Sequence, residues 1–274
     1  MKRFSFLLLI ALAPPVYAAD PPGWVAPMKQ VHAKFTGMPG TFALFGDSIS
    51  VTMAFWAPFE YAPKTLEEDT AKALQTVKGY MKEDCWRKWR GSEYGNESGK
   101  TIVWASENVD AWLKKLNPEL AVLMFGTNDL GPIGEKEYDA KTRTVIERCL
   151  KNGTVVILTT IPPRSGQLEK AKKFASVQRK IAADFDLPLI DYQAEILKRR
   201  PDDWDGSLPK FKEFAKDAYE VPTLIAGDGV HPSNPKKFQD YSEESLRSNG
   251  FQLRNVLTLK AYAEAIRLVM SAKK

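Results

Sequence analysis

Short apolar runs alternate with longer amphipathic segments along most of this 274-residue chain. Runs with the length and composition of buried strands cover residues 41–45, 120–125, 154–161 and 187–190. Apolar residues at helical spacing predict helices over residues 66–81, 101–116, 136–150, 168–184 and 257–270. Strands that are apolar throughout and alternate with helices indicate an α/β fold, in which helices cover both faces of a parallel sheet.

The first nineteen residues have the features of an export signal. A basic start at Lys2 and Arg3 is followed by an apolar stretch from Phe4 to Ala13 and by small residues around Ala18. That stretch has about ten residues, half of what a helix needs to span a bilayer, although an uncleaved anchor is the alternative. We therefore predict a signal peptide at 1–19, secretion or a periplasmic location, and no stable membrane insertion once the signal is removed.

Composition and charge narrow the class of protein further. Hydrophobic residues make up 44% of the chain and charged residues 27%, as in a globular protein, and the length alone fits either one domain with insertions or two small domains. The net charge is +5, or +3 without Lys2 and Arg3, when 37 basic residues stand against 34 acidic ones. This excess is too small to indicate nucleic acid as a partner.

Three polar motifs lie next to the predicted elements, where parallel α/β sheets usually carry functional groups. Gly-Asp-Ser-Ile-Ser at 46–50 follows the first strand, Gly-Thr-Asn-Asp at 126–129 follows the second, and Asp-Gly-Val-His at 228–231 precedes the last helix. In such sheets, functional residues gather at the carboxyl ends of the strands. The three motifs are therefore expected to meet.

Histidine is scarce, which limits the choice of a general base near neutral pH to His32, His231 or a carboxylate. His32 lies in the polar segment 29–34 and is expected at the surface. His231 follows Asp228 by three residues. A carboxylate at that distance can orient the imidazole and stabilise its charged form.

Ser48 is the candidate nucleophile, because it directly follows a buried strand and Gly46 permits a tight turn there. Its amide, at the start of a helix, can also donate a hydrogen bond to a developing oxyanion. The side chain of Asn128 and the amide of Gly99 are further candidate donors. The alternatives are a helix cap at Ser48 and a simple turn at Asn128.

In their order and separation, these motifs resemble the four sequence blocks of the SGNH hydrolases, also called GDSL esterases: Gly46-Asp47-Ser48, Gly99, Gly126-Thr127-Asn128-Asp129 and Asp228-Gly229-Val230-His231. The resemblance covers about residues 41–270, and it implies that residues 20–274 form a single domain. It implies a flavodoxin-like three-layer α/β/α sandwich around a five-stranded parallel sheet. It also implies that Ser48 is the nucleophile, His231 the base and Asp228 its orienting acid. The oxyanion hole would comprise the Ser48 and Gly99 amides and the Asn128 side chain.

Two departures from the family pattern concern the first two blocks. The first block reads Asp-Ser-Ile-Ser instead of the common Asp-Ser-Leu. The segment 85–95 is too polar to show the expected second strand, so Gly95 is an alternative to Gly99 as the amide donor. The segment 95–101 is one residue short of a phosphate-binding loop. Two histidines and two cysteines supply no recognisable zinc site, so no metal and no cofactor are expected.

Two cysteines, Cys85 and Cys149, permit a disulfide in an exported protein, and two buried free thiols are the alternative. Insertions are predicted near 52–95, 201–221 and 238–255, and such loops often carry specificity. They are rich in aromatic residues that either stack on sugar rings beside Arg87, Lys88 and Arg90 or pack the insertions onto the domain: Phe55, Trp56, Phe59, Tyr61, Trp86, Trp89, Trp204 and Phe211.

Together these features predict an exported serine esterase that removes short acyl groups, acetyl in particular, from a small-molecule or polysaccharide ester. A lysophospholipase or thioesterase acting on longer chains is the alternative within the same class. A carbohydrate-binding protein on a degenerate hydrolase scaffold is the alternative from another class. The presence of Ser48, Asn128, Asp228 and His231 together favours an enzyme.

Overall fold

The structure, a computed structural model, describes residues 20–61 and 66–270. The signal peptide predicted at residues 1–19 lies outside the described residues. Across the two described ranges, every helix is too short or too polar to span a lipid bilayer.

A parallel sheet forms the centre of the molecule. Its four strands lie side by side in chain order: β1 (Phe42–Gly46), β2 (Leu120–Met124), β3 (Val155–Thr159) and β4 (Leu189–Ile190). The register places Leu44 opposite Val122, and Val122 opposite Ile157. The first three strands are buried along their whole length, as expected for continuously apolar strands with helices on both faces.

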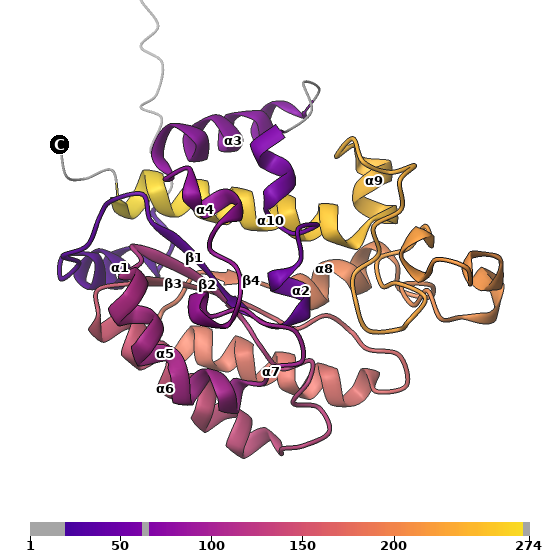
Figure 1. The fold of residues 1–274 in the computed structure, drawn as a ribbon, viewed down its shortest axis with the longest axis horizontal. Coiled ribbons are helices and arrows are strands. Elements are labelled where there is room, and N and C mark those ends of the chain that lie inside the picture. The colour runs from indigo at the N-terminus through magenta and orange to yellow at the C-terminus, as the bar shows by residue number, and fades with distance from the viewer. Residues whose placement is uncertain (1–19, 62–65, 271–274) are drawn as a thin grey trace, which may run out of the picture.

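Helices cover both faces of this sheet, which confirms the predicted α/β/α sandwich (Figure 1). One face carries α5 (Ile102–Leu116), α6 (Glu135–Lys151) and α7 (Leu168–Asp184), whereas α3 (Glu68–Tyr80) and α10 (Gly250–Ala265) lie on the other. A π-helical turn (Ile266–Met270) continues α10 and packs against α1 (Val25–His32). The shorter helices are α2 (Ser48–Val51), α4 (Asp84–Arg87), α8 (Tyr192–Arg199) and α9 (Glu243–Ser248).

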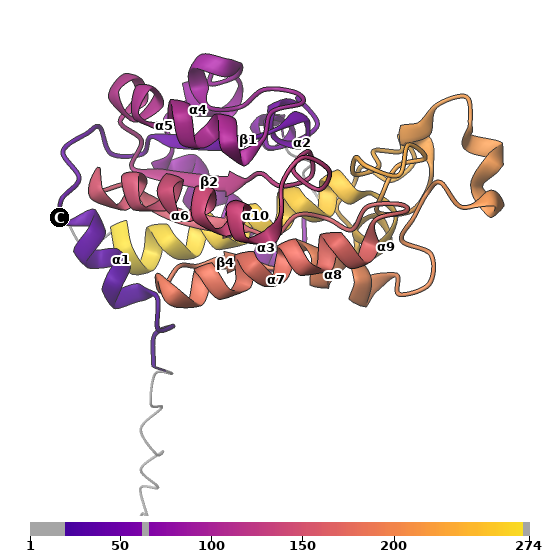
Figure 2. The ribbon, with the colours of Figure 1, turned by 90° about the horizontal axis from the view of Figure 1, so that it is seen from below.

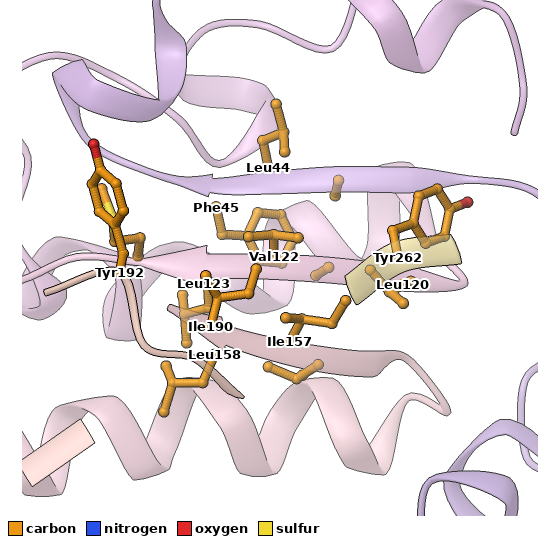
Figure 3. Close-up of a cluster of buried hydrophobic side chains, with 14 of the residues drawn as sticks. Leu44, Phe45, Leu120, Val122, Leu123, Ile157, Leu158, Ile190, Tyr192 and Tyr262 are labelled. Atoms are coloured by element: carbon orange, nitrogen blue, oxygen red, sulfur yellow. The ribbon is translucent and has the colours of Figure 1, made fainter. Parts of the chain in front are cut away.

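The hydrophobic core lies between the sheet and these helices. Figure 3 shows side chains of the neighbouring strands packed against one another, with Tyr192 and Tyr262 at the two ends of the cluster. The Tyr262 ring, from α10, stacks on Phe42 of β1 at a centroid distance of 4.4 Å. The Tyr192 hydroxyl donates to the carbonyl of Gly250 at the start of α10. Both tyrosines therefore attach α10 to the body of the fold.

The prediction of five strands is wrong by one within the described residues. Where a second strand was expected, the polar segment forms α4 and a 3₁₀ turn (Ser92–Tyr94) instead. Only a single parallel bridge, between Gly46 and Asn96, remains at the free edge of β1. The Asn96 side chain completes this edge, because its Nδ2 donates to the Leu44 carbonyl at 2.9 Å.

The expectation for His32 is also wrong, because its side chain is only 6% exposed. Its Nε2 lies 2.7 Å from Oε1 of Glu119, a carboxylate that also accepts from Tyr80 and from the Gly40 amide. The partner that buries His32 is 87 residues away in the sequence, so the polar neighbours of His32 give no indication of it.

The two cysteines are free, buried thiols. Cys85 lies on α4, where its Sγ accepts a hydrogen bond from the Phe42 amide, and Cys149 lies on α6. Figure 1 shows these two helices on opposite faces of the sheet, so the thiols cannot form a disulfide. Burial raises the pKa of each thiol to about 12, which keeps both protonated and unreactive.

The last helix begins seven residues earlier than the sequence pattern predicts, at Gly250 instead of Leu257. Asn249 caps it by accepting from the Gln252 amide at 3.0 Å. The first two turns of α10 are buried on all sides, including the polar Gln252, Arg254 and Asn255. A helix buried all round lacks an amphipathic pattern, which is why its start was missed.

Between α8 and α9 the chain forms an irregular lobe, residues 200–242, that contains the insertion predicted at 201–221. It projects from the end of the molecule at which α2 lies (Figures 1 and 2). Short 3₁₀ turns at Pro209–Phe214 and Ala218–Glu220 are its regular elements. This lobe carries Asp228 and His231.

Candidate active site

The polar motifs of the sequence meet at the carboxyl end of the sheet. Ser48 is the first residue of α2, directly after β1. Asp47 caps this short helix, with its Oδ1 accepting from the Ile49 amide at 3.0 Å. The lobe brings His231 across the sequence from 183 residues away, and its Nε2 lies 2.9 Å from the Ser48 Oγ.

Asp228 completes a continuous chain of hydrogen bonds. Its Oδ2 lies 2.6 Å from the His231 Nδ1, while its Oδ1 accepts from the amides of Val230 and His231. Gly229 allows this tight turn, because its φ is +70° and an added Cβ would collide with Ser165. The predicted Ser48, His231 and Asp228 are thus assembled in the geometry that serine hydrolases use.

The electrostatic environment of His231 suits a general base. The hydrogen bond that Asp228 accepts from His231 is the main reason that the pKa of His231 lies above its usual 6.5, although partial burial of His231 opposes this effect. For Asp228, burial is the largest single effect, and it disfavours the charged carboxylate. The hydrogen bonds from His231 and from the two backbone amides together outweigh burial and lower the pKa of Asp228. Asp228 therefore stays ionised over the pH range in which His231 titrates.

Asn128 lies beside this chain of residues, as the sequence predicts. Its Nδ2 donates to the Lys100 carbonyl at 3.0 Å and to Oδ2 of Asp47 at 3.3 Å. The longer of these two bonds is the weaker one. The neighbouring Asp129 has another role, since it accepts from the Ile102 amide and so caps α5.

The two candidate glycines differ in the availability of their amides. The Gly95 amide donates to the Ser92 carbonyl, and an added Cβ at Gly95 would collide with the Phe45 ring. Gly95 thus serves the packing beneath β1. The Gly99 amide makes no hydrogen bond to any described residue, and its neighbour Ser98 lines the cleft beside Ser48. Of the two, only Gly99 has an amide free to bind an oxyanion.

A cleft of about 430 Å³ opens at Ser48 and His231. Val51, Thr52 and Ala54 line one part of it, and Tyr219, Asn234 and Phe251 line another. Two larger hollows, of about 660 and 670 Å³, lie away from this site: one between α3 and α10, the other beside His32 at the opposite end of the molecule. The cleft at Ser48 is smaller, but it is the one lined by the hydrogen-bonded Ser48 and His231.

Two arginines, the buried Arg254 and the half-buried Arg90, hold the segment that follows Ser48. Arg254, from α10, donates to the Ile49 carbonyl at 2.6 Å and to the Ser50 Oγ at 2.9 Å. Arg90 donates to the Ser50 carbonyl at 2.6 Å and to the Phe55 carbonyl at 2.9 Å. Cations at the carboxyl end of α2 complement its dipole and satisfy carbonyls that have no helical partner.

Burial lowers the pKa of Arg254 to about 9, and the same burial raises the pKa of Asp47 to about 6. Each group favours the charged form of the other, which offsets part of the cost of burying both. The polar residues that hold the Ser48 segment were missed in the sequence, because the helix that carries Arg254 was not predicted to extend that far.

Replacing Arg254 by methionine is expected to lower the free energy of unfolding by about 2 kcal/mol, because buried acceptors at Ile49 and Ser50 lose their donor. Arg148→Met is a matched control, since the half-exposed Arg148 on α6 bonds Asp110 at the surface and should cost less than about 1 kcal/mol. Urea denaturation of both variants measures the difference. Equal stability of Arg254→Met and wild type would contradict the assigned role of Arg254.

Most of the aromatic side chains predicted as sugar platforms pack the insertions onto the domain instead. The buried ones are Phe55, Trp56, Phe59, Trp86 and Trp204. Arg90, which lies beside some of these aromatic residues in the sequence, donates to backbone carbonyls. The two aromatic residues that do line the cleft, Tyr219 and Phe251, were not singled out in the sequence. Tyr219 comes next to His231 only through the fold of the lobe.

Comparisons with known proteins agree with this fold. The Enterococcus faecalis lipase/acylhydrolase structure is similar at a TM-score of 0.50 and 16% identity, over 81% of this chain and 94% of that one. TesA is similar at a TM-score of 0.50 and 17% identity, over 83% of this chain and 99% of that one. An α/β hydrolase from the Lake Arreo metagenome is similar at a TM-score of 0.50 and 17% identity, over 83% of this chain and 97% of that one. A comparison with curated proteins finds no significant match.

These structures thus share the α/β fold of this chain. Residues 44–235 match the model of the GDSL-like lipase/acylhydrolase family. The chain belongs to this family. Its general activity is accordingly that of an ester hydrolase, and the resemblance seen in the sequence motifs is confirmed.

Proposed function

We propose that the protein is an exported serine esterase that releases short acyl groups, in particular acetyl, from carbohydrate esters. The observation that carries this proposal is the unbroken series of hydrogen bonds from the Ser48 Oγ through His231 to Asp228, with Ser48 and His231 lining an open cleft. The export signal expected at residues 1–19 supports an extracytoplasmic location.

The reaction would begin with attack of the Ser48 Oγ on the ester carbonyl, while the His231 Nε2 accepts the hydroxyl proton. The carbonyl oxygen gains negative charge and is bound by the Ser48 and Gly99 amides and by the Asn128 Nδ2. Collapse of the tetrahedral intermediate breaks the bond to the alcohol, which leaves with the proton held by His231. Water then attacks the acyl-serine by the same route, with His231 as base, and releases the acid.

The walls of the cleft support a short acyl group and a polar alcohol. The cleft holds about 430 Å³ in total, which the acyl group and part of the alcohol must share. Thr52, Ser98 and Asn234 contribute polar groups, while Phe251 is the large apolar side chain among its lining. A long acyl chain would need a continuous apolar wall, and this mixture of residues does not provide one.

Hydrolysis of p-nitrophenyl esters with two, four and eight carbons tests the acyl preference. We expect the highest kcat/KM for acetate and a steady decrease with chain length, because longer chains extend beyond the cleft. A preference for the eight-carbon ester would instead favour the lysophospholipase or thioesterase alternative. Absence of hydrolysis of every ester would favour the carbohydrate-binding alternative.

Replacing Asn128 by alanine is expected to lower kcat about 10²-fold with a smaller change in KM, because this donor would act chiefly on the transition-state oxyanion. Asn108→Ala is the matched control: the Asn108 Nδ2 also bonds a backbone carbonyl, that of Trp104, but on α5. Steady-state kinetics with p-nitrophenyl acetate compare the two. An Asn128→Ala enzyme with kcat within threefold of wild type would remove Asn128 from the oxyanion hole.

A further inference from the structure

An exposed aromatic ring lies against the imidazole of His231. Tyr219, in the 3₁₀ turn Ala218–Glu220, is 39% exposed and lines the cleft. Its ring centroid is 6.0 Å from that of His231, with the two planes inclined by 43°. Hydrogen bonds hold its backbone: its amide donates to Asp217, and its carbonyl accepts from the Asn234 amide at 2.8 Å. The backbone that carries the ring is therefore held in place beside the cleft.

Asn234 places a free hydrogen-bond donor next to this ring. Its Oδ1 accepts from the Gln239 Nε2 at 3.0 Å and from the Asn249 Nδ2 at 3.2 Å, which fixes the orientation of the amide. Its Nδ2 donates to no described residue, and Asn234 lines the cleft together with Tyr219. An aromatic face and a free amide on adjacent segments make a surface that can bind both an apolar face and a hydroxyl group.

The chemistry of the proposed reaction decides which part of the substrate reaches this surface. The alcohol oxygen must receive its proton from the His231 Nε2, so it leaves from the side of Ser48 on which His231 lies. The groups nearest to His231 therefore contact the alcohol, whereas the oxyanion donors at Gly99 and Asn128 surround the acyl carbonyl. Tyr219 and Asn234 are on the alcohol side.

We propose that Tyr219 and Asn234 form the binding subsite for the leaving alcohol, and that this alcohol is a sugar ring with its apolar face on the Tyr219 ring. The C–H groups on one face of a pyranose would pack on the aromatic ring, and a hydroxyl group or ring oxygen would accept from the Asn234 Nδ2. This inference rests on the proposed esterase function and specifies its substrate class.

Two acetate esters with different alcohols test it: methyl 2-O-acetyl-β-D-xylopyranoside, whose alcohol is a ring, and ethyl acetate, whose alcohol is not. Tyr219→Ala is expected to lower kcat/KM for the xyloside about tenfold, mainly through KM, and to leave that for ethyl acetate within about twofold. Tyr219→Phe keeps the aromatic face and is expected to match wild type on both esters.

Asn234→Asp keeps the Oδ1 that holds Gln239 and Asn249 but replaces the donor amide with an acceptor. Assayed above the pH at which His231 loses its proton, this variant is expected to lose about tenfold in kcat/KM on the xyloside and little on ethyl acetate. Tyr61→Ala serves as the control for removing an exposed tyrosine, because Tyr61 is 72% exposed and does not line the cleft.

Equal losses on both esters in Tyr219→Ala would overturn the inference, because they would show that Tyr219 acts on His231 and not on the sugar. An unchanged Tyr219→Ala enzyme would overturn it as well. Failure of the esterase proposal looks different, since the wild-type enzyme would then hydrolyse neither of the two esters nor p-nitrophenyl acetate.

Discussion

Replacement of Ser48 by alanine is expected to reduce kcat for p-nitrophenyl acetate by about 10⁴-fold or more, because the Oγ that would form the acyl-enzyme is lost. The fold should be unaffected: Ser48 is the first residue of α2, and Asp47, not Ser48, caps that helix through its side chain. Steady-state kinetics measure the loss, and circular dichroism with thermal unfolding verifies the fold. A fluorophosphonate should label wild type and not Ser48→Ala.

Ser92→Ala is the control for this experiment, because Ser92 is an exposed serine in the 3₁₀ turn before Gly95 and its side chain has no assigned partner. It should retain both hydrolysis and labelling. If Ser48→Ala kept the wild-type rate, Ser48 would not be the nucleophile and the proposed mechanism would be wrong.

Asp228→Asn is expected to lower kcat about 10³-fold to 10⁴-fold. An asparagine amide that donates to the His231 Nδ1 would favour the tautomer with its proton on Nε2, which cannot accept the Ser48 proton. The turn itself should survive, since the asparagine oxygen can still accept from the Val230 and His231 amides. Asp217→Asn is a suitable control, because Asp217 likewise accepts from a nearby amide, that of Tyr219.

The same variant changes the pH dependence in a defined direction. His231 works as a base only when neutral, and Asp228 raises its pKa, so the acid limb of kcat/KM in wild type should lie above pH 6.5. Without the Asp228 charge the pKa falls, because partial burial then disfavours the imidazolium. The acid limb of Asp228→Asn should therefore move to lower pH while the plateau falls. A limb that moves to higher pH, or does not move, would contradict this assignment.

Local patterns were sufficient for the four strands, for most helices and for the motifs that contain Ser48 and Asn128. The apolar runs at β1, β2 and β3 are continuous, and Ser48 and Asn128 follow β1 and β2 within a few residues. Because these two strands are neighbours in the sheet, the residues that follow them lie at the same edge. The motif containing Asp228 and His231 needed the family resemblance, because it approaches Ser48 only through an irregular lobe. Its hydrogen bond to Ser48 joins residues 183 positions apart.

The wrong predictions share a physical cause, namely partners that are distant in the sequence. His32 appears polar among its neighbours, yet Glu119 makes its burial favourable. The polar start of α10 resembles a loop, yet its Arg254 and Asn255 satisfy backbone groups between Ile49 and Trp56. The expected second strand is replaced by the side chain of Asn96 at the edge of β1. Tyr219 gains importance only because the lobe returns to His231.

The contact between Arg254 and Ile49 has a consequence for the time at which activity can arise. The two residues are 205 positions apart, so the segment behind Ser48 obtains this donor only after nearly the whole chain has been synthesised. A nascent chain that already contains all four motifs would still lack the Arg254 hydrogen bonds to the segment after Ser48 until α10 docks. Hydrolysis should therefore appear late in refolding, with the burial of α10 rather than with formation of the sheet.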